Sequence, residues 1–133
     1  MMTSEGASST IQPLADGYVR KTTKRAARKQ RGRHDTATQL AIHTHLYDWL
    51  VTHPASPFMT PHPRPSTEPH SYEMAAIDTT TTPLLTREEV ATLLPTQLTE
   101  LEVGIGYELR DCEFYRQPDG RVAVIDFDQV RAL

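Results

Sequence analysis

The clearest fold signal in the sequence is LTREEVATLL, which spans residues 85–94. Thr86 stands where a helix N-cap would stand, and Glu89 follows three residues later, which is the spacing of a capping box. Leu85 and Val90 occupy the two positions of a hydrophobic staple, and Pro95 would end the helix. The stretch therefore predicts a short, well-capped helix that begins just after Thr86.

The residues that follow predict a second helix and a hairpin. An apolar repeat at helical spacing starts after Thr96, and two glycines break it: the repeat is Leu98, Leu101 and Ile105, and the glycines are Gly104 and Gly106. Pro118-Asp119-Gly120 then separates two runs rich in β-forming residues, 113–116 and 121–125, which is typical of a hairpin. Asp126 or Asp128 can cap a last helical turn. Residues 84–133 are therefore predicted to form one small folded unit.

The predicted order of helix, turn, helix, hairpin and helical turn is that of a small winged helix-turn-helix protein. Within it, residues 85–94 resemble the opening helix of the excisionase-like and mercury-regulator-like family, whose usual form is L-T-x-E-E-A-A-x-L-L. The resemblance implies that the second helix enters the major groove of DNA and that the hairpin is a wing on the phosphate backbone. Arg116 and Arg121 would then contact the backbone from the wing. The alternative for this unit is a small acidic domain that binds a protein.

Upstream, residues 18–34 hold eight basic residues and no acid, whereas the whole chain has a formal net charge of −3. Six of the eight recur in pairs every four residues and would cover half of a helix surface: Arg20, Lys21, Lys24, Arg25, Arg28 and Lys29. Arg31 and Arg33 extend the charge beyond Gly32. The pattern resembles the arginine-rich motifs of phage antiterminators and the basic arms of DNA-binding proteins, which implies contact with phosphates. The alternatives are a solvated basic tail and a block that lies on the acidic C-terminal unit.

The remaining segments predict one more helix between a tail and a linker. A helix should run from Asp35 or Thr36 to about Val51, and its apolar stripe should contact a partner or a second copy through Leu46, Trp49 and Leu50. Residues 1–17 are small and polar, which predicts a disordered tail. Residues 54–83 hold seven prolines and four successive threonines, which predicts an extended Pro/Thr-rich linker. The domain organisation expected is thus 1–17 tail, 18–53 basic arm with amphipathic helix, 54–83 linker and 84–133 folded unit.

Several classes of protein are disfavoured by composition. The chain has one cysteine, which permits no internal disulfide, and no apolar run long enough to span a membrane. Its first residues lack the features of a secretory signal, so a cytoplasmic location is expected. His43 and His45 lack the i,i+4 spacing of a helical zinc pair, and no catalytic arrangement or cofactor motif is present. We therefore expect neither an enzyme nor a metal or cofactor site.

These observations predict a mainly α fold with a small β-hairpin, in which a winged helix-turn-helix-like unit follows a basic helical segment and a linker. The predicted function is that of a small DNA-binding regulatory protein, a repressor or an excisionase-like factor of phage or mobile-element origin. Two alternatives stay open. One is an adaptor of a large assembly whose basic arm and linker pack on other subunits or on packaged genome; the other is an RNA-binding, antitermination-like factor.

Overall fold

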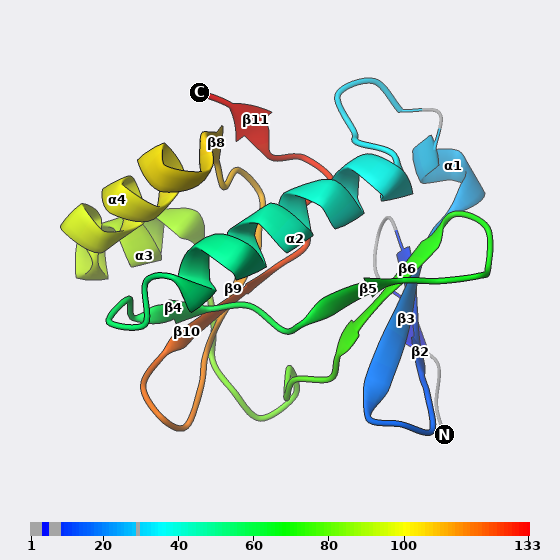
Figure 1. Ribbon diagram of the computed structural model, residues 1–133, viewed down its shortest axis with the longest axis horizontal. Coiled ribbons are helices and arrows are strands. Elements are labelled where there is room, and N and C mark those ends of the chain that lie inside the picture. The colour runs from blue at the N-terminus through cyan, green and yellow to red at the C-terminus, as the bar shows by residue number, and fades with distance from the viewer. Residues whose placement is uncertain (1–3, 6–8, 29) are drawn as a thin grey trace.

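The computed structural model describes residues 4–5, 9–28 and 30–133 and shows a mixed α/β fold in which helices cover twisted sheets (Figure 1). Its helices are α1 (Arg25–Arg28), α2 (Thr36–Val51), α3 (Arg87–Leu93) and α4 (Pro95–Ile105). They are accompanied by three sheets, of five, four and two strands. The prediction of a mainly α fold with a single hairpin was therefore wrong.

The five-stranded sheet is built largely from segments that the sequence predicted to be helix, tail or linker. Its order is β1 (Ser4–Glu5), β2 (Ser9–Pro13), β3 (Tyr18–Thr23), β6 (Ser71–Ala75) and β5 (Pro63–Pro65), and all neighbours are antiparallel. Residues 18–23 form a strand between β2 and β6, and their side chains alternate between two faces: Lys21 and Thr23 point into the fold, and Tyr18 and Arg20 point outward. The prolines of β5 are tolerated because this strand lies at the edge of the sheet.

The four-stranded sheet contains the predicted hairpin, with β9 (Glu113–Arg116) antiparallel to β10 (Val122–Ile125) around Gly120, so this part of the prediction is confirmed. On the other side of β10 lies β4 (Phe58–Met59), which comes from the expected linker and pairs with β10 in parallel. The outer neighbour of β9 is β7 (Leu84–Leu85). A small two-stranded sheet joins β8 (Tyr107–Glu108) to β11 (Arg131–Ala132). The sequence predicted a last helical turn near β11, and this prediction was wrong.

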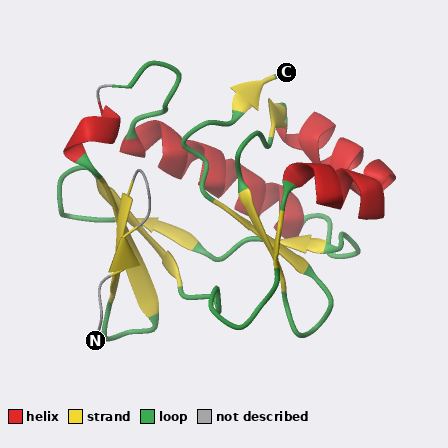
Figure 2. Ribbon diagram, turned by 180° about the vertical axis from the view of Figure 1, so that it is seen from behind, coloured by secondary structure: helices red, strands yellow, loops and turns green. Residues whose placement is uncertain are grey.

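The helix α2 packs against both larger sheets and against α4, and it lies across the front of the molecule in Figure 1. Figure 2 shows the same arrangement from behind, with the two larger sheets side by side beneath the helices. Leu46 is fully buried in the core, so its predicted role in contacting a partner was wrong; Trp49 and Leu50 are partly buried against the same core.

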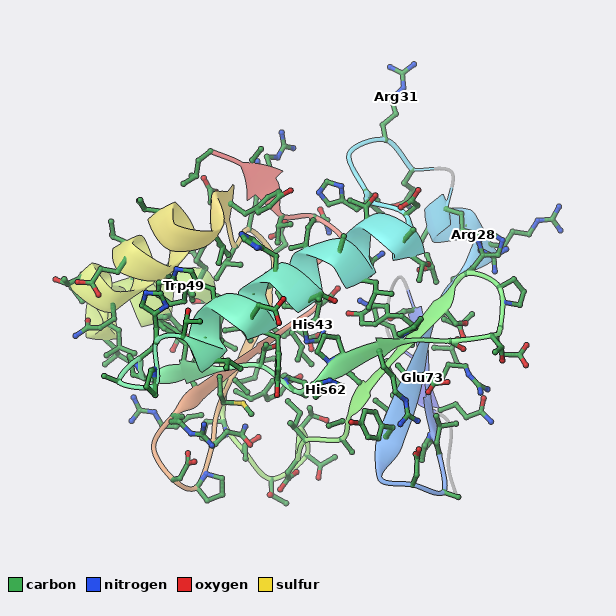
Figure 3. All side chains as sticks on the ribbon, in the orientation of Figure 1. Arg28, Arg31, His43, Trp49, His62 and Glu73 are labelled. Atoms are coloured by element: carbon green, nitrogen blue, oxygen red, sulfur yellow. The ribbon has the colours of Figure 1, made fainter. Side chains whose placement is uncertain are left out.

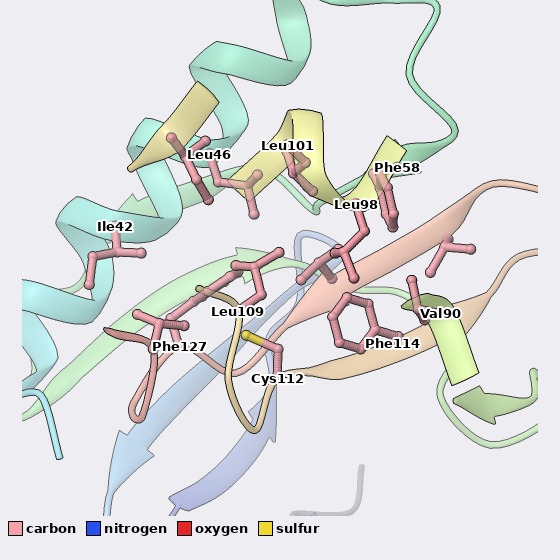
Figure 4. Close-up of a cluster of buried hydrophobic side chains, with 14 residues drawn as sticks. Ile42, Leu46, Phe58, Val90, Leu98, Leu101, Leu109, Cys112, Phe114 and Phe127 are labelled. Atoms are coloured by element: carbon pink, nitrogen blue, oxygen red, sulfur yellow. The ribbon is translucent and has the colours of Figure 1, made fainter. Parts of the chain in front are cut away.

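One main core joins parts of the chain that the sequence assigned to separate domains (Figure 4). It combines Ile42 and Leu46 of α2, Phe58 of β4 and a set from residues 84–133 that includes Val90, Leu98, Leu101, Phe114, Val122 and Val124. Residues 84–133 therefore do not form a separate winged unit behind a linker. Two local predictions within this segment are confirmed. The capping box of Thr86 and Glu89 is present, and Gly106 ends α4 in a left-handed conformation with φ of 80°.

Candidate nucleic-acid interface

The structure divides the predicted basic segment between a strand, a short helix and a turn. Arg20 and Lys21 belong to β3, Lys24 stands between β3 and α1, Arg25 and Arg28 belong to α1, and Arg31 and Arg33 to the turn before α2. Lys29 lies outside the described residues. The seven described cations therefore do not share one helical face.

Lys21 is buried inside the fold, with only 4% of its surface exposed. Its Nζ donates hydrogen bonds to Asp126 Oδ1 at 3.0 Å and to Gln39 Oε1 at 3.1 Å. Burial disfavours the charged ammonium, but the neighbouring Tyr72 and Asp126 outweigh that effect and raise the pKa of Lys21. Lys21 is therefore an internal structural cation, and it contributes nothing to a surface for phosphates.

Arg20 points to the outer face of the five-stranded sheet, where acidic residues partly neutralise it. Strand pairing aligns Gln12, Arg20, Glu73 and Arg64 in one row across the sheet. Arg20 Nη2 lies 3.6 Å from Glu73 Oε2, and Arg64 Nε donates to Glu73 Oε1 at 2.7 Å. Arg64 also pairs with Asp16 at 2.6 Å. Asp16 lies outside the row, but together with Glu73 it sets two carboxylates against the two arginines, so these four side chains carry no net charge.

Arg33 is held at the other end of the basic segment. It forms an ion pair with Asp128, whose side chain is only 5% exposed. The next residue, His34, donates its backbone N–H to the Asp128 carbonyl oxygen at 2.8 Å, and its Nε2 lies 2.7 Å from the Val130 carbonyl oxygen. Arg33 thus fixes the turn to the C-terminal segment.

Three arginines remain on the surface between these anchors: Arg25, Arg28 and Arg31. Figure 3 shows Arg28 and Arg31 extending away from the body of the molecule. Arg28 Nε donates to the Thr23 carbonyl oxygen at 3.0 Å, which holds the guanidinium by one nitrogen; among the described residues its Nη atoms form no ion pair. Within residues 9–28 and 30–133, none of the three forms an ion pair with a carboxylate. We call residues 24–33 the cationic turn.

The structure does not bring Arg116 and Arg121 to the cationic turn. Both belong to the β9–β10 hairpin, whose loop lies at the opposite end of the molecule from α1 (Figure 1). Arg121 Nε donates to Asp119 Oδ2 at 2.8 Å, so much of its charge is compensated locally. The helix α4 carries Glu100 and Glu102 and no cation; Glu102 binds Arg87 at 2.7 Å and the Leu109 N–H at 2.8 Å, which makes it a structural carboxylate.

One exposed cation near the cationic turn escaped the sequence analysis. Arg131 of β11 directly follows Val130, whose carbonyl oxygen contacts the His34 ring, so its backbone lies beside the turn. Nothing in the local sequence marks this residue, because it is separated from the cationic turn by about a hundred positions. Only the tertiary fold brings it near.

Other candidate sites are less developed in the part of the chain that the structure describes. A pocket of about 370 Å³ lies between the end of α2 and β4, with Tyr47, Leu50, Phe58 and Met59 among its walls. Arg121 also lines the pocket, and it is already paired with Asp119. No group of three or more His, Cys, Asp or Glu side chains is placed to hold a metal ion within the described ranges. No helix there is both long and apolar enough to cross a membrane.

Comparison with known proteins adds no relative. No family model matches the chain, and neither a curated protein nor a solved structure matches it significantly. The cationic turn is therefore the feature of the molecule from which a function is proposed.

Proposed function

We propose that this protein binds the phosphate backbone of nucleic acid through the cationic turn, as a small DNA-binding regulatory protein without catalytic activity. The observation that carries the proposal is the set of three arginines, Arg25, Arg28 and Arg31, held on the surface with no carboxylate paired to them within the described residues. In a chain of net charge −3, a local cationic surface of this kind favours a polyanionic partner.

The contacts available favour binding that does not depend on base sequence. Arginines on a four-residue helix and a turn can contact phosphates, but a helix of four residues is too short to present several side chains to base edges in a groove. The helix α4, which the winged helix-turn-helix prediction placed in the major groove, carries acidic side chains and no cation. We therefore expect the affinity to be nearly equal for all duplex sequences of one length.

Salt dependence tests the proposal. Three arginines on phosphates would give a slope of log affinity against log salt of about −3 on duplex DNA. Replacing Arg25 and Arg31 together by Gln should flatten that slope by about two units. Both side chains are exposed, and neither forms an ion pair with a carboxylate of the described residues. The readout is fluorescence anisotropy of a labelled duplex of about 20 base pairs, titrated at several salt concentrations.

A matched control removes the same charge elsewhere. Replacing Arg116 and Arg121 by Gln on the distant hairpin should leave the slope unchanged. If the Arg25/Arg31 variant keeps the full slope, the cationic turn is not the phosphate-binding surface. Equal titrations with an RNA hairpin decide between the duplex proposed here and the RNA alternative, and binding to neither would favour an acidic protein partner.

A further inference from the structure

Both ends of the cationic turn are attached to the same three residues, Asp126-Phe127-Asp128. Asp126 accepts from Lys21 Nζ at 3.0 Å, and Lys21 lies three residues before the turn begins. Asp128 pairs with Arg33 at the last residue of the turn. One ion pair therefore holds the chain just before the cationic turn, and the other holds the last residue of the turn.

A buried glutamine connects these two attachments. Gln39 of α2 is only 1% exposed; its Oε1 accepts from Lys21 Nζ at 3.1 Å, and its Nε2 donates to the His34 carbonyl oxygen at 3.0 Å. Thr23 Oγ1 and Thr36 Oγ1 lie 3.1 Å apart and join the two ends of the loop once more. The start and the end of the loop are thus tied to each other as well as to the carboxylates.

The Asp126-Phe127-Asp128 segment is itself fixed in the core. Phe127 is fully buried, and its ring centroid lies 4.8 Å from that of His43. Asp126 adopts a left-handed backbone conformation with φ of 72°, which Asp tolerates better than most residues. A rigid base of this kind can hold the loop in one conformation.

We propose that Asp126 and Asp128 act as positioning residues that preorganise the cationic turn for a polyphosphate backbone. This inference rests on the function proposed above. It predicts a change in affinity opposite in sign to the one that simple electrostatics predicts. Coulomb's law alone predicts that removing a carboxylate beside the turn raises the affinity for a polyanion. A positioning role predicts that removing Asp128 lowers the affinity, because the freed loop has to be ordered during binding.

The decisive variant is Asp128→Asn in the full chain, compared with Glu100→Gln, which makes the same change of charge on the exposed face of α4. With the labelled duplex at low salt, Asp128→Asn should bind about three- to tenfold more weakly. Glu100→Gln should bind as well as the parent protein or slightly better. Hydrogen exchange of the free protein should show faster exchange of the His34 and Gln39 amides in Asp128→Asn only.

A second pair of variants covers the case in which Asp128→Asn does not fold. Arg33→Gln and Arg31→Gln each remove one cation from the same turn, but only Arg33 belongs to an attachment. The positioning role predicts the larger loss of affinity, and faster His34 exchange, for Arg33→Gln. Equal losses, or tighter binding by Asp128→Asn with unchanged exchange, would overturn the inference.

The exchange and binding readouts separate the two proposals. If the parent protein does not bind the duplex or an RNA hairpin at any salt concentration, the proposed function is wrong. Faster His34 exchange in the variants would then still support the attachment of the loop, whereas unchanged exchange would overturn it independently of binding.

Discussion

At the scale of single residues, His43 shows how burial fixes a protonation state. Its side chain is fully buried, Nε2 lies 2.8 Å from the Pro61 carbonyl oxygen, and Nδ1 lies 3.1 Å from the Tyr72 hydroxyl. The ring is satisfied as a neutral imidazole that donates from Nε2 and accepts at Nδ1. Burial lowers the pKa of His43 to about 3, and the nearby Lys21 and His62 act in the same direction.

A pH dependence of stability follows from this residue. Between pH 6.5 and pH 3 the unfolded His43 binds a proton that the folded one does not, so the free energy of unfolding should fall as the pH falls through this window. His43→Gln should flatten the dependence between pH 6.5 and pH 4.5, whatever its effect on absolute stability. Urea unfolding at a series of pH values measures the slope. The exposed His45, replaced in the same way, provides the control, and an unchanged slope in His43→Gln would refute the assignment.

At the scale of secondary-structure elements, α2 and α4 pack closely because Gly104 has no side chain. A Cβ atom at this position would lie 2.3 Å from Trp49 Nε1 and 2.7 Å from Trp49 Cζ2. Trp49 has little freedom to retreat, because its ring stacks on His53 at a centroid distance of 3.8 Å. Gly104 was predicted to break the helix, and this was wrong: it lies inside α4, where it allows the close contact with Trp49 of α2.

Gly104→Ala should therefore destabilise the protein although alanine favours helices by about 1 kcal/mol over glycine. Forcing a methyl group against the indole ring should destabilise by about 1–3 kcal/mol. In a Trp49→Leu background the same substitution should be neutral or stabilising, because only the helix preference remains. A double-mutant cycle by urea unfolding measures the coupling; additive effects would show that the ring does not limit the helix approach.

Elements that depend on neighbouring residues could be predicted from the sequence, whereas elements that depend on distant residues could not. The capping box at Thr86 and the β9–β10 hairpin depend on neighbours in the chain, and both were predicted correctly. The strand β3 was read as helix because Arg20, Lys21, Lys24 and Arg25 satisfy a four-residue repeat. What makes it a strand is pairing with β2 and β6, and what lets Lys21 point inward is Asp126, 105 positions away. For the candidate site, charge alone indicated Arg25, Arg28 and Arg31, but the ion pairs of Lys21 with Asp126 and of Arg33 with Asp128 could not be predicted from the sequence.

At the scale of the whole molecule, the central strand of the four-stranded sheet depends on a segment far from it in sequence. All four residues of β10 are buried, and β4 covers one of its edges. Ile42, Leu46 and Phe58 complete the core around Val90, Leu98 and Val124. Residues 84–133 alone would therefore expose both the free edge of β10 and the apolar face that α2 now covers.

We accordingly expect the fragment 84–133 not to fold on its own. An isolated strand edge and a core without its covering helix leave too little buried apolar surface to offset the conformational entropy of about fifty residues. The full chain should show a cooperative urea transition by far-UV circular dichroism and well-dispersed amide resonances, whereas the fragment should show neither. A fragment with a sharp transition and native-like dispersion would mean that the core of residues 84–133 is self-sufficient. The β4 and α2 contacts would then be an addition to an independent unit, as the sequence first suggested.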